Sequence, residues 1–138
     1  DPHEAGALAL RLDQFNSERR AIEQAVLDAA LARIGEPAAV PPAIVVMDDG
    51  WHPGVIGIVA SRLVERFHRP VFVIGFDGET GKGSGRSVRG VDLGSIVIAA
   101  RQSGLLINGG GHAMAAGLTI ARGMAEAFAA FMVERVAT

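Results

Sequence analysis

The spacing of apolar residues along the chain predicts four helices. Apolar side chains recur every three or four positions, as on one face of a helix, in four stretches of the sequence. These stretches are residues 2–34, 53–68, 93–102 and 124–136. The first is much longer than the others and precedes the part of the chain in which helices and strands alternate.

The segments between these helices predict strands. Two β-branched runs lack alternation, as is typical of strands covered on both faces, and two further segments fit strands less regularly. In chain order the predicted strands are residues 43–47, 71–76, 82–88 and 116–120. The first two flank a helix, which predicts a βαβ unit with parallel strands. We therefore expect an α/β fold, with a mixed central β-sheet flanked by helices.

The long first helix divides the chain into two predicted parts. Asn16 and Ser17 in its middle have short polar side chains that can cap a new helix, so we expect a kink or break there. Gly35 and the prolines that follow it end the helix. The sequence thus predicts a helix and linker over residues 1–40 and an α/β domain over residues 41–138.

Composition narrows the possible functions. A chain of 138 residues with 49% hydrophobic content can bury a core, and its net charge of −2 excludes the general basic field of a protein that coats nucleic acid. The absence of cysteine excludes disulfides and thiolate chemistry. No apolar run is long enough to span a membrane, and the first residues do not resemble a signal peptide. We expect an excised domain of a cytoplasmic protein.

Three consecutive glycines lead into a histidine at Gly109, Gly110, Gly111 and His112. Glycine lets backbone N–H groups approach a bound group closely, so this loop could form a nest for an anion, with the imidazole adding a donor. The alternative is a tight turn between packed elements. The loop alone does not separate these interpretations.

A second candidate anion site lies at Ser84 and Arg86. Residues two apart on a strand point to the same side, so these two side chains should face one ligand, while Ser87 faces away. Arginine can hold a phosphate through two parallel hydrogen bonds. With the glycine and histidine stretch elsewhere in the chain, the pattern favours phosphate binding over a surface arginine.

Other common sites are missing from the sequence. The chain contains no P-loop, no dinucleotide-binding glycine pattern and no nucleophile elbow. Its four histidines are scattered, and Asp48-Asp49 fits a turn better than a metal pair.

Three segments, taken together and in order, resemble the RecJ family, the single-strand-specific DNA exonucleases among the DHH phosphoesterases. They are residues 51–63, 81–87 and 109–120. The resemblance covers the DHH-associated domain of that family from about residue 43 onward. The first helix, with its segment 16–20, resembles the connector that joins this domain to the catalytic DHH domain.

The resemblance implies roles for particular residues. It implies substrate phosphate binding by Ser84, Arg86, Gly110, Gly111 and His112. Secondary contributions could come from Ser87, Arg89, His52 and Gly109. It implies no catalytic or metal-binding residue in this segment, because manganese or magnesium belongs to the DHH domain, so we expect no nuclease activity from this chain alone.

The function implied by the resemblance is substrate binding in a 5′–3′ single-strand-specific DNA exonuclease of DNA repair and recombination. The implied partners are single-stranded DNA and the DHH domain of the same protein, without a membrane. Two alternatives remain open on the residues alone. One is a domain of an oligoribonucleotide or cyclic-dinucleotide phosphodiesterase, and the other is a non-catalytic protein-interaction module.

Overall fold

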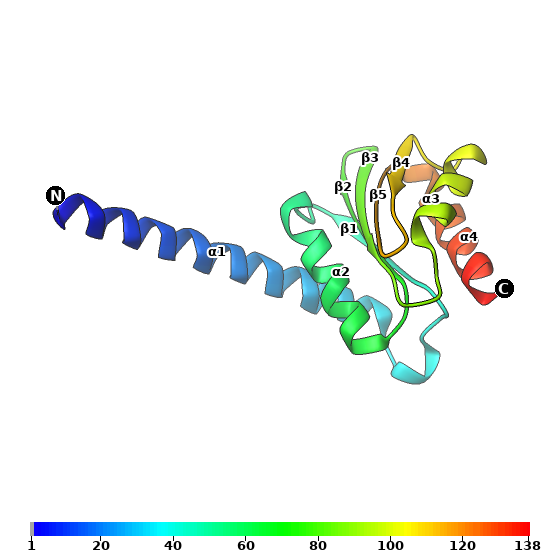
Figure 1. The fold of residues 1–138 in the computed structure, drawn as a ribbon, viewed down its shortest axis with the longest axis horizontal. Helices are drawn as coiled ribbons and strands as arrows, with labels where there is room; N and C mark the ends of the chain where they lie inside the picture. Colours follow the sequence, from blue (N-terminus) through cyan, green and yellow to red (C-terminus); the bar gives the residue numbers. More distant parts are fainter. Residues whose placement is uncertain (1) are drawn as a thin grey trace.

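A computed structural model describes residues 2–138 of the chain, with side chains described for residues 11–36 and 38–138. Helices and strands alternate after a long first helix, as expected (Figure 1). The helices are α1 (Pro2–Ile34), α2 (Pro53–Phe67), α3 (Leu93–Gln102) and α4 (Ala125–Ala137), with short 3₁₀ turns at Pro37–Ala39 and Arg122–Met124. The strands are β1 (Ile44–Asp49), β2 (Val71–Asp77), β3 (Thr80–Arg86), β4 (Asn108–Gly111) and β5 (Ala115–Ala121).

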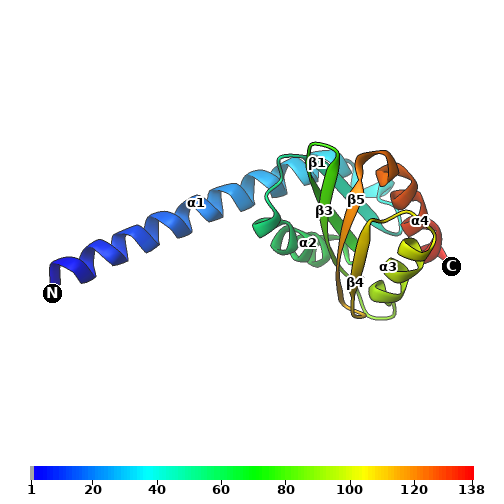
Figure 2. The same cartoon turned by 90° about the horizontal axis from the view of Figure 1, so that it is seen from above.

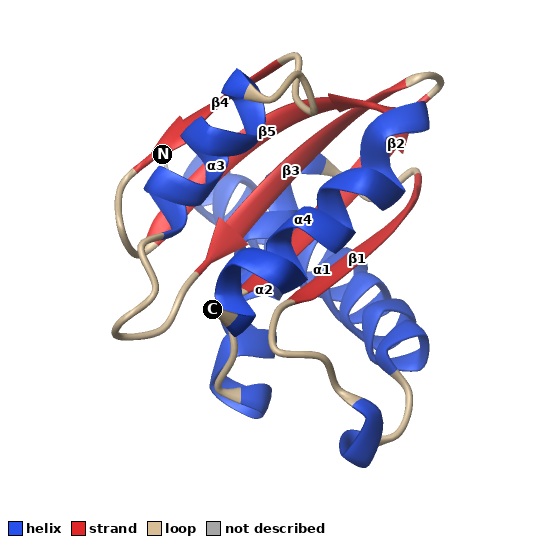
Figure 3. Ribbon diagram, turned by 90° about the vertical axis from the view of Figure 1, so that its right-hand side faces the viewer, coloured by secondary structure: helices blue, strands red, loops and turns tan. Residues whose placement is uncertain are grey.

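The five strands form one mixed sheet in the order β1-β2-β3-β5-β4 (Figure 3). Strands β1 and β2 are parallel and joined through α2, which confirms the predicted βαβ unit. The pairs β2–β3, β3–β5 and β4–β5 are antiparallel. Because β5 lies between β3 and β4, residues far apart in the sequence become neighbours across these three strands.

The hydrophobic core has two parts, one on each face of the sheet. Helix α2 and the end of α1 cover one face, and α3 and α4 cover the other (Figure 1). On the α4 face the rings of Phe72 and Phe128, both fully buried, meet edge to face with centroids 5.4 Å apart. On the α2 face Val59, Ala60 and Leu63 are fully buried.

Helix α1 is continuous, so the predicted kink or break near Asn16 and Ser17 is wrong. Both side chains are exposed, and Ser17 Oγ accepts a hydrogen bond from Arg20 Nη2 on the same helix at 3.5 Å. A capping residue starts a new helix only where the amides that follow it lack helical acceptors, which is not the case inside a continuous helix. The helix ends as predicted, at Gly35 with a φ of 77°.

Most of α1 extends away from the sheet, and only its last part packs on α2 (Figure 2). There Val26 and Ala30 are buried in the core. None of the helices within residues 2–138 has both the length and the apolar character that crossing a bilayer requires.

The glycine stretch was predicted as a loop, and this is a second correction. Asn108–Gly111 forms the edge strand β4, paired with β5. Glycine is a poor strand former, so local propensity gave no strand there. Packing explains the exception, because a Cβ on Gly109 would lie only 2.8 Å from Val97 Cγ1 of α3. The missing side chain lets β4 lie close against that helix.

We predict that Phe128→Ala lowers the free energy of unfolding by about 3–5 kcal/mol, because it empties a fully buried site beneath Phe72. Urea denaturation followed by circular dichroism measures the change. Phe15→Ala is the matched control, since Phe15 on α1 is 62% exposed and its removal should leave stability nearly unchanged. Equal losses in both variants would contradict the assignment of the core.

Candidate functional site

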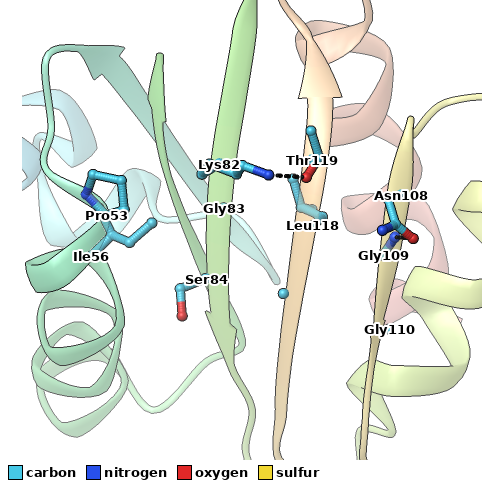
Figure 4. A pocket seen from close by; sticks show the side chains of 11 residues that line it. Pro53, Ile56, Lys82, Gly83, Ser84, Asn108, Gly109, Gly110, Leu118 and Thr119 are labelled. Carbon is cyan, nitrogen blue, oxygen red and sulfur yellow. Dashed lines mark hydrogen bonds between the residues drawn. The ribbon is translucent and has the colours of Figure 1, made fainter. Parts of the chain in front are cut away.

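An open groove of about 680 Å³ lies over the part of the sheet that α2 leaves uncovered (Figure 4). Helix α2 packs on β2 and β3, and the groove continues from its edge across β5 to β4. Its lining residues are Pro53, Ile56, Lys82, Gly83, Ser84, Asn108, Gly109, Gly110, Gly117, Leu118 and Thr119.

Strand pairing arranges the floor of the groove in cross-strand rows. One row holds Ser84 on β3, Gly117 on β5 and Gly110 on β4. The two glycines leave bare backbone beside the Ser84 hydroxyl, and a Cβ on Gly110 would meet nothing within 4 Å. The row therefore offers a flat surface on which a ligand could approach the main chain.

The neighbouring rows carry the charged side chains. Lys82 pairs with Thr119, which pairs with Asn108, on one side of the Ser84 row. On the other side Arg86 pairs with Ala115. The two cations thus lie on opposite sides of the Ser84 row, Lys82 in the lining of the groove and Arg86 just outside it.

Ser84 and Arg86 point to the same side of the sheet, as the sequence predicted. Arg86 Nη1 donates to Ser84 Oγ at 3.1 Å and to the Gly85 carbonyl at 2.8 Å. Above them, a Cβ on Gly57 of α2 would lie 2.9 Å from Arg86 Nη2. Among the described side chains, no carboxylate forms an ion pair with Arg86. The guanidinium keeps its charge available for an anionic ligand.

The hairpin between β4 and β5 holds His112 through its backbone. The His112 N–H donates to the Ala115 carbonyl at 2.9 Å, and the His112 carbonyl accepts from the Gly94 N–H at 3.1 Å. The amide of His112 is therefore not free for the anion nest considered from the sequence. Its side chain is exposed, and His112 lies opposite Ala115, in the row of Arg86.

The start of α3 anchors this hairpin. The N–H groups of Leu93 and Gly94 donate to the carbonyls of Ala113 and His112 at 2.9 and 3.1 Å. Asp92 caps the same helix by accepting from the Ser95 N–H at 3.1 Å. This amide bond, followed by the bond from the Ser95 hydroxyl, lowers the pKa of Asp92 from its usual 3.8.

Each of the three positions before His112 requires or tolerates glycine for a different structural reason. Gly109 allows close packing on α3, as described above. Gly111 has a φ of 151°, and a Cβ there would lie 2.4 Å from the Ala115 carbonyl oxygen, so only glycine fits the hairpin. Gly110 has neither constraint, and its bare backbone lines the groove.

The secondary residues separate into different environments. Ser87 is 4% exposed, and its hydroxyl donates to the Val91 carbonyl at 2.6 Å, so we leave it out of the proposed site. His52 caps α2, with Nδ1 accepting from the Gly54 N–H at 2.9 Å, which is a structural role. Arg89 is exposed in the turn before α3.

Sequence reasoning missed Lys82, Thr119 and Asn108 as groove residues. Lys82 Nζ donates to Thr119 Oγ1 at 2.8 Å across the two strands (Figure 4). The alternation of Lys82, Ser84 and Arg86 along β3 was a usable signal for Lys82. Thr119 and Asn108 gave no such signal, because only the strand order brings them to Lys82.

The described residues do not fit a metal centre. Nowhere in the part of the chain with described side chains do three or more histidine or carboxylate groups come together in a way that could hold an ion. Asp48 and Asp49, interpreted from the sequence as turn residues, end β1 and form ion pairs with Arg33 and Arg122. The Arg33 hydrogen bond and the Asp49 amide lower the pKa of Asp48.

The chain forms a mixed α/β domain with an open groove over part of its sheet, and comparison with known families assigns this domain to one of them. Residues 39–138 match the model of the DHHA1 domain, and the chain belongs to this family.

Its curated relatives carry the name of one enzyme, the single-stranded-DNA-specific exonuclease RecJ. The RecJ of Bacillus subtilis is 45% identical over 87% of this chain, and that of Salmonella typhimurium is 40% identical over 91%. The alignments cover 15% and 23% of those proteins, so the chain spans about a fifth of their length.

The solved structure of RecJ from Thermus thermophilus in complex with Mg²⁺ has the same fold. Its TM-score is 0.86 at 36% identity, and the match covers 99% of this chain and 21% of that one. The same protein has been solved in complex with Mn²⁺. The match confirms the mixed α/β fold with a long first helix.

We predict that alanine destabilises the domain at Gly111 but not at the neighbouring Gly110. Gly111→Ala should lower the free energy of unfolding by about 1–3 kcal/mol, because the new methyl group overlaps the Ala115 carbonyl. Gly110→Ala is the control and should fold with nearly unchanged stability, since its methyl group enters open space. Chemical denaturation of both variants measures the difference, and equal stability would contradict the hairpin geometry.

We also predict a pH-dependent effect of the α3 cap. Asp92→Ala should lower the melting temperature at neutral pH by removing the bond to the Ser95 amide. Because the pKa of Asp92 is lowered, its stabilisation is complete above the usual value of 3.8 and is lost as pH falls through the lowered pKa. The difference between wild type and variant should therefore shrink in acid. A constant difference in melting scans across this range would contradict the prediction, and Asp92→Asn, which keeps a capping oxygen, should lose less at neutral pH.

Proposed function

We propose that this chain is the substrate-binding domain of a RecJ-like exonuclease, which degrades single-stranded DNA in the 5′–3′ direction. The observation that carries the proposal is the pair Ser84 and Arg86, presented together on the sheet beside a bare glycine floor. Arg86 has no carboxylate partner among the described side chains, so a phosphate would supply the missing negative charge. The names of the relatives support DNA as the ligand.

In this proposal the chain binds and positions the strand. Arg86 and Ser84 hold a phosphate through charge-assisted hydrogen bonds, and the exposed imidazole of His112, which follows β4 at the far end of the same row, adds a second contact to the strand. Gly110 keeps a side chain off the floor of the groove, and Gly111 allows the hairpin that carries His112. Fixing the strand in one position lowers the entropic barrier to its cleavage.

The hydrolysis itself is proposed to take place outside this chain. The described residues form no metal cluster, and the chain spans about a fifth of the relatives it matches. We assign manganese or magnesium to a DHH domain of the same protein, which would be a partner of this domain. Residues 1–40 would then be the connector and residues 41–138 the binding domain.

The cellular setting follows from the same proposal. A strand-specific exonuclease of this type would act in DNA repair and recombination in the cytoplasm. The groove is open, and its floor crosses β3, β5 and β4, which favours an extended oligonucleotide over a compact cyclic dinucleotide. Relative affinity for single-stranded DNA and a cyclic dinucleotide tests this preference.

We predict that Arg86→Ala weakens binding of a 5′-phosphorylated single-stranded oligonucleotide by about tenfold or more, the usual loss for a hydrogen bond to a charged group. Fluorescence anisotropy at several salt concentrations measures it. Affinity falls as salt rises, and a plot of log affinity against log salt has a negative slope. In Arg86→Ala the magnitude of this slope should be smaller by about 0.7, the value for one phosphate contact on a single strand. His112→Ala should also weaken binding, and in the longer protein both changes should reduce cleavage.

Two variants control this experiment. Arg135→Ala removes an exposed arginine of α4, on the far side of the sheet, and should bind like wild type. Arg86→Lys keeps the charge but loses the two-pronged geometry, so it should recover only part of the affinity. Unchanged affinity and salt slope in Arg86→Ala would refute the proposed site.

A further inference from the structure

The end of the groove opposite Arg86 carries a second cation that the proposed phosphate site does not use. Lys82 Nζ is turned across β5 to Thr119 Oγ1, at 2.8 Å (Figure 4). Pro53 of α2 lines the groove on one side of it and Asn108 of β4 lines it on the other. The ammonium group therefore lies beside the Thr119 hydroxyl, and Asn108 follows one strand further along the same row of the sheet.

This positive charge is not part of a general basic surface. Lys82 is the only lysine in a chain whose net charge is −2. Among the described side chains, no carboxylate forms an ion pair with it. Its one recorded side-chain partner is the neutral hydroxyl of Thr119. An ammonium group has three donors, so the bond to Thr119 leaves capacity for an anion.

The spacing along β3 separates Lys82 from the first phosphate site. Four residues of strand place the Cα atoms of Lys82 and Arg86 about 13 Å apart. Arg86 turns back toward Ser84, while Lys82 turns sideways toward Thr119. In these orientations the two side chains hold different partners, Ser84 on β3 and Thr119 on β5, so each cation marks its own position for a phosphate.

The floor between the two cations suits a nucleic acid backbone. Gly117 and Gly110 occupy the intervening row on β5 and β4, where no side chain rises from the sheet. A Cβ on Gly110 would meet nothing within 4 Å. A chain of sugars and phosphates can therefore lie flat between Arg86 and Lys82.

We propose that Lys82, with Thr119 beside it and Asn108 at the far end of the same row, forms a second subsite for an internucleotide phosphate of the same strand. This inference rests on the proposed function, because Ser84 and Arg86 hold the first phosphate. A mononucleotide fills only the first subsite, and a longer strand fills both. Lys82 therefore makes affinity depend on ligand length.

The test compares thymidine 5′-monophosphate with a 5′-phosphorylated thymidine hexanucleotide. Lys82→Ala should weaken hexanucleotide binding about two- to fivefold, as expected for an exposed ion pair, and lower its salt slope by about 0.7. Mononucleotide binding, measured by NMR titration, should not change. Lys82→Arg should retain hexanucleotide affinity. Arg66→Ala, which removes an exposed charge on the last turn of α2, is the matched control.

Acylation gives a readout that is independent of affinity. Because the chain has one lysine, an amine-specific acylating reagent modifies Lys82 and the N-terminal amine, and peptide mapping distinguishes these two sites. The hexanucleotide should slow acylation of Lys82 in wild type, and the mononucleotide should not.

The outcomes separate the two proposals. If Arg86→Ala weakens both ligands while Lys82→Ala changes neither and the hexanucleotide gives no protection, the second subsite is wrong and the proposed function stands. If wild type binds neither ligand, or Arg86→Ala changes neither, both proposals fail. Equal losses for both ligands in Lys82→Ala would also refute the length dependence.

Discussion

The close contact of α2 with β3 at Gly57 is the constraint on which the site depends. A Cβ at this position would lie 2.9 Å from Arg86 Nη2 and 3.1 Å from Ser84 Oγ. Because glycine stands there, the helix lies low over the strand, and the guanidinium is held between helix and sheet. The same contact leaves β5 and β4 beyond the edge of α2, where the groove opens. One small residue thus affects both the orientation of Arg86 and the width of the groove.

The position of His112, the residue of the site that lies beyond β4, depends on main-chain hydrogen bonds. The first amides of α3 are taken by the carbonyls of Ala113 and His112, so the helix start acts as a clamp on the β4–β5 hairpin. Gly94 permits this contact, since a Cβ there would lie 3.0 Å from the carbonyl oxygens of Gly111 and His112. The position of the imidazole is therefore coupled to the stability of a helix on the opposite face of the sheet.

Much of the fold could be predicted from local patterns, and the failures have physical reasons. Helices α2, α3 and α4 and strands β1, β2 and β5 were visible as periodic or continuous apolar segments. Strand β4 was not, because its glycines oppose strand formation and only packing against α3 and pairing with β5 stabilise it. Ser84 and Arg86 could be paired from their spacing on one strand. The partners Thr119 and Asn108 could not, because the order β3-β5-β4 does not follow the sequence.

The length and continuity of helix α1 affect how its N-terminal end can move relative to the sheet. It is one uninterrupted helix of 33 residues, about 50 Å long, and only its last turns are fixed to the sheet. Without a hinge in the middle, the helix transmits motion as a lever. A body attached at its far end can swing toward the groove chiefly by rotating about the contact with α2, where Val26 and Ala30 are buried and Glu23 pairs with Arg62 at 2.9 Å. A small rotation of α1 about this contact would displace its N-terminal end by many ångströms.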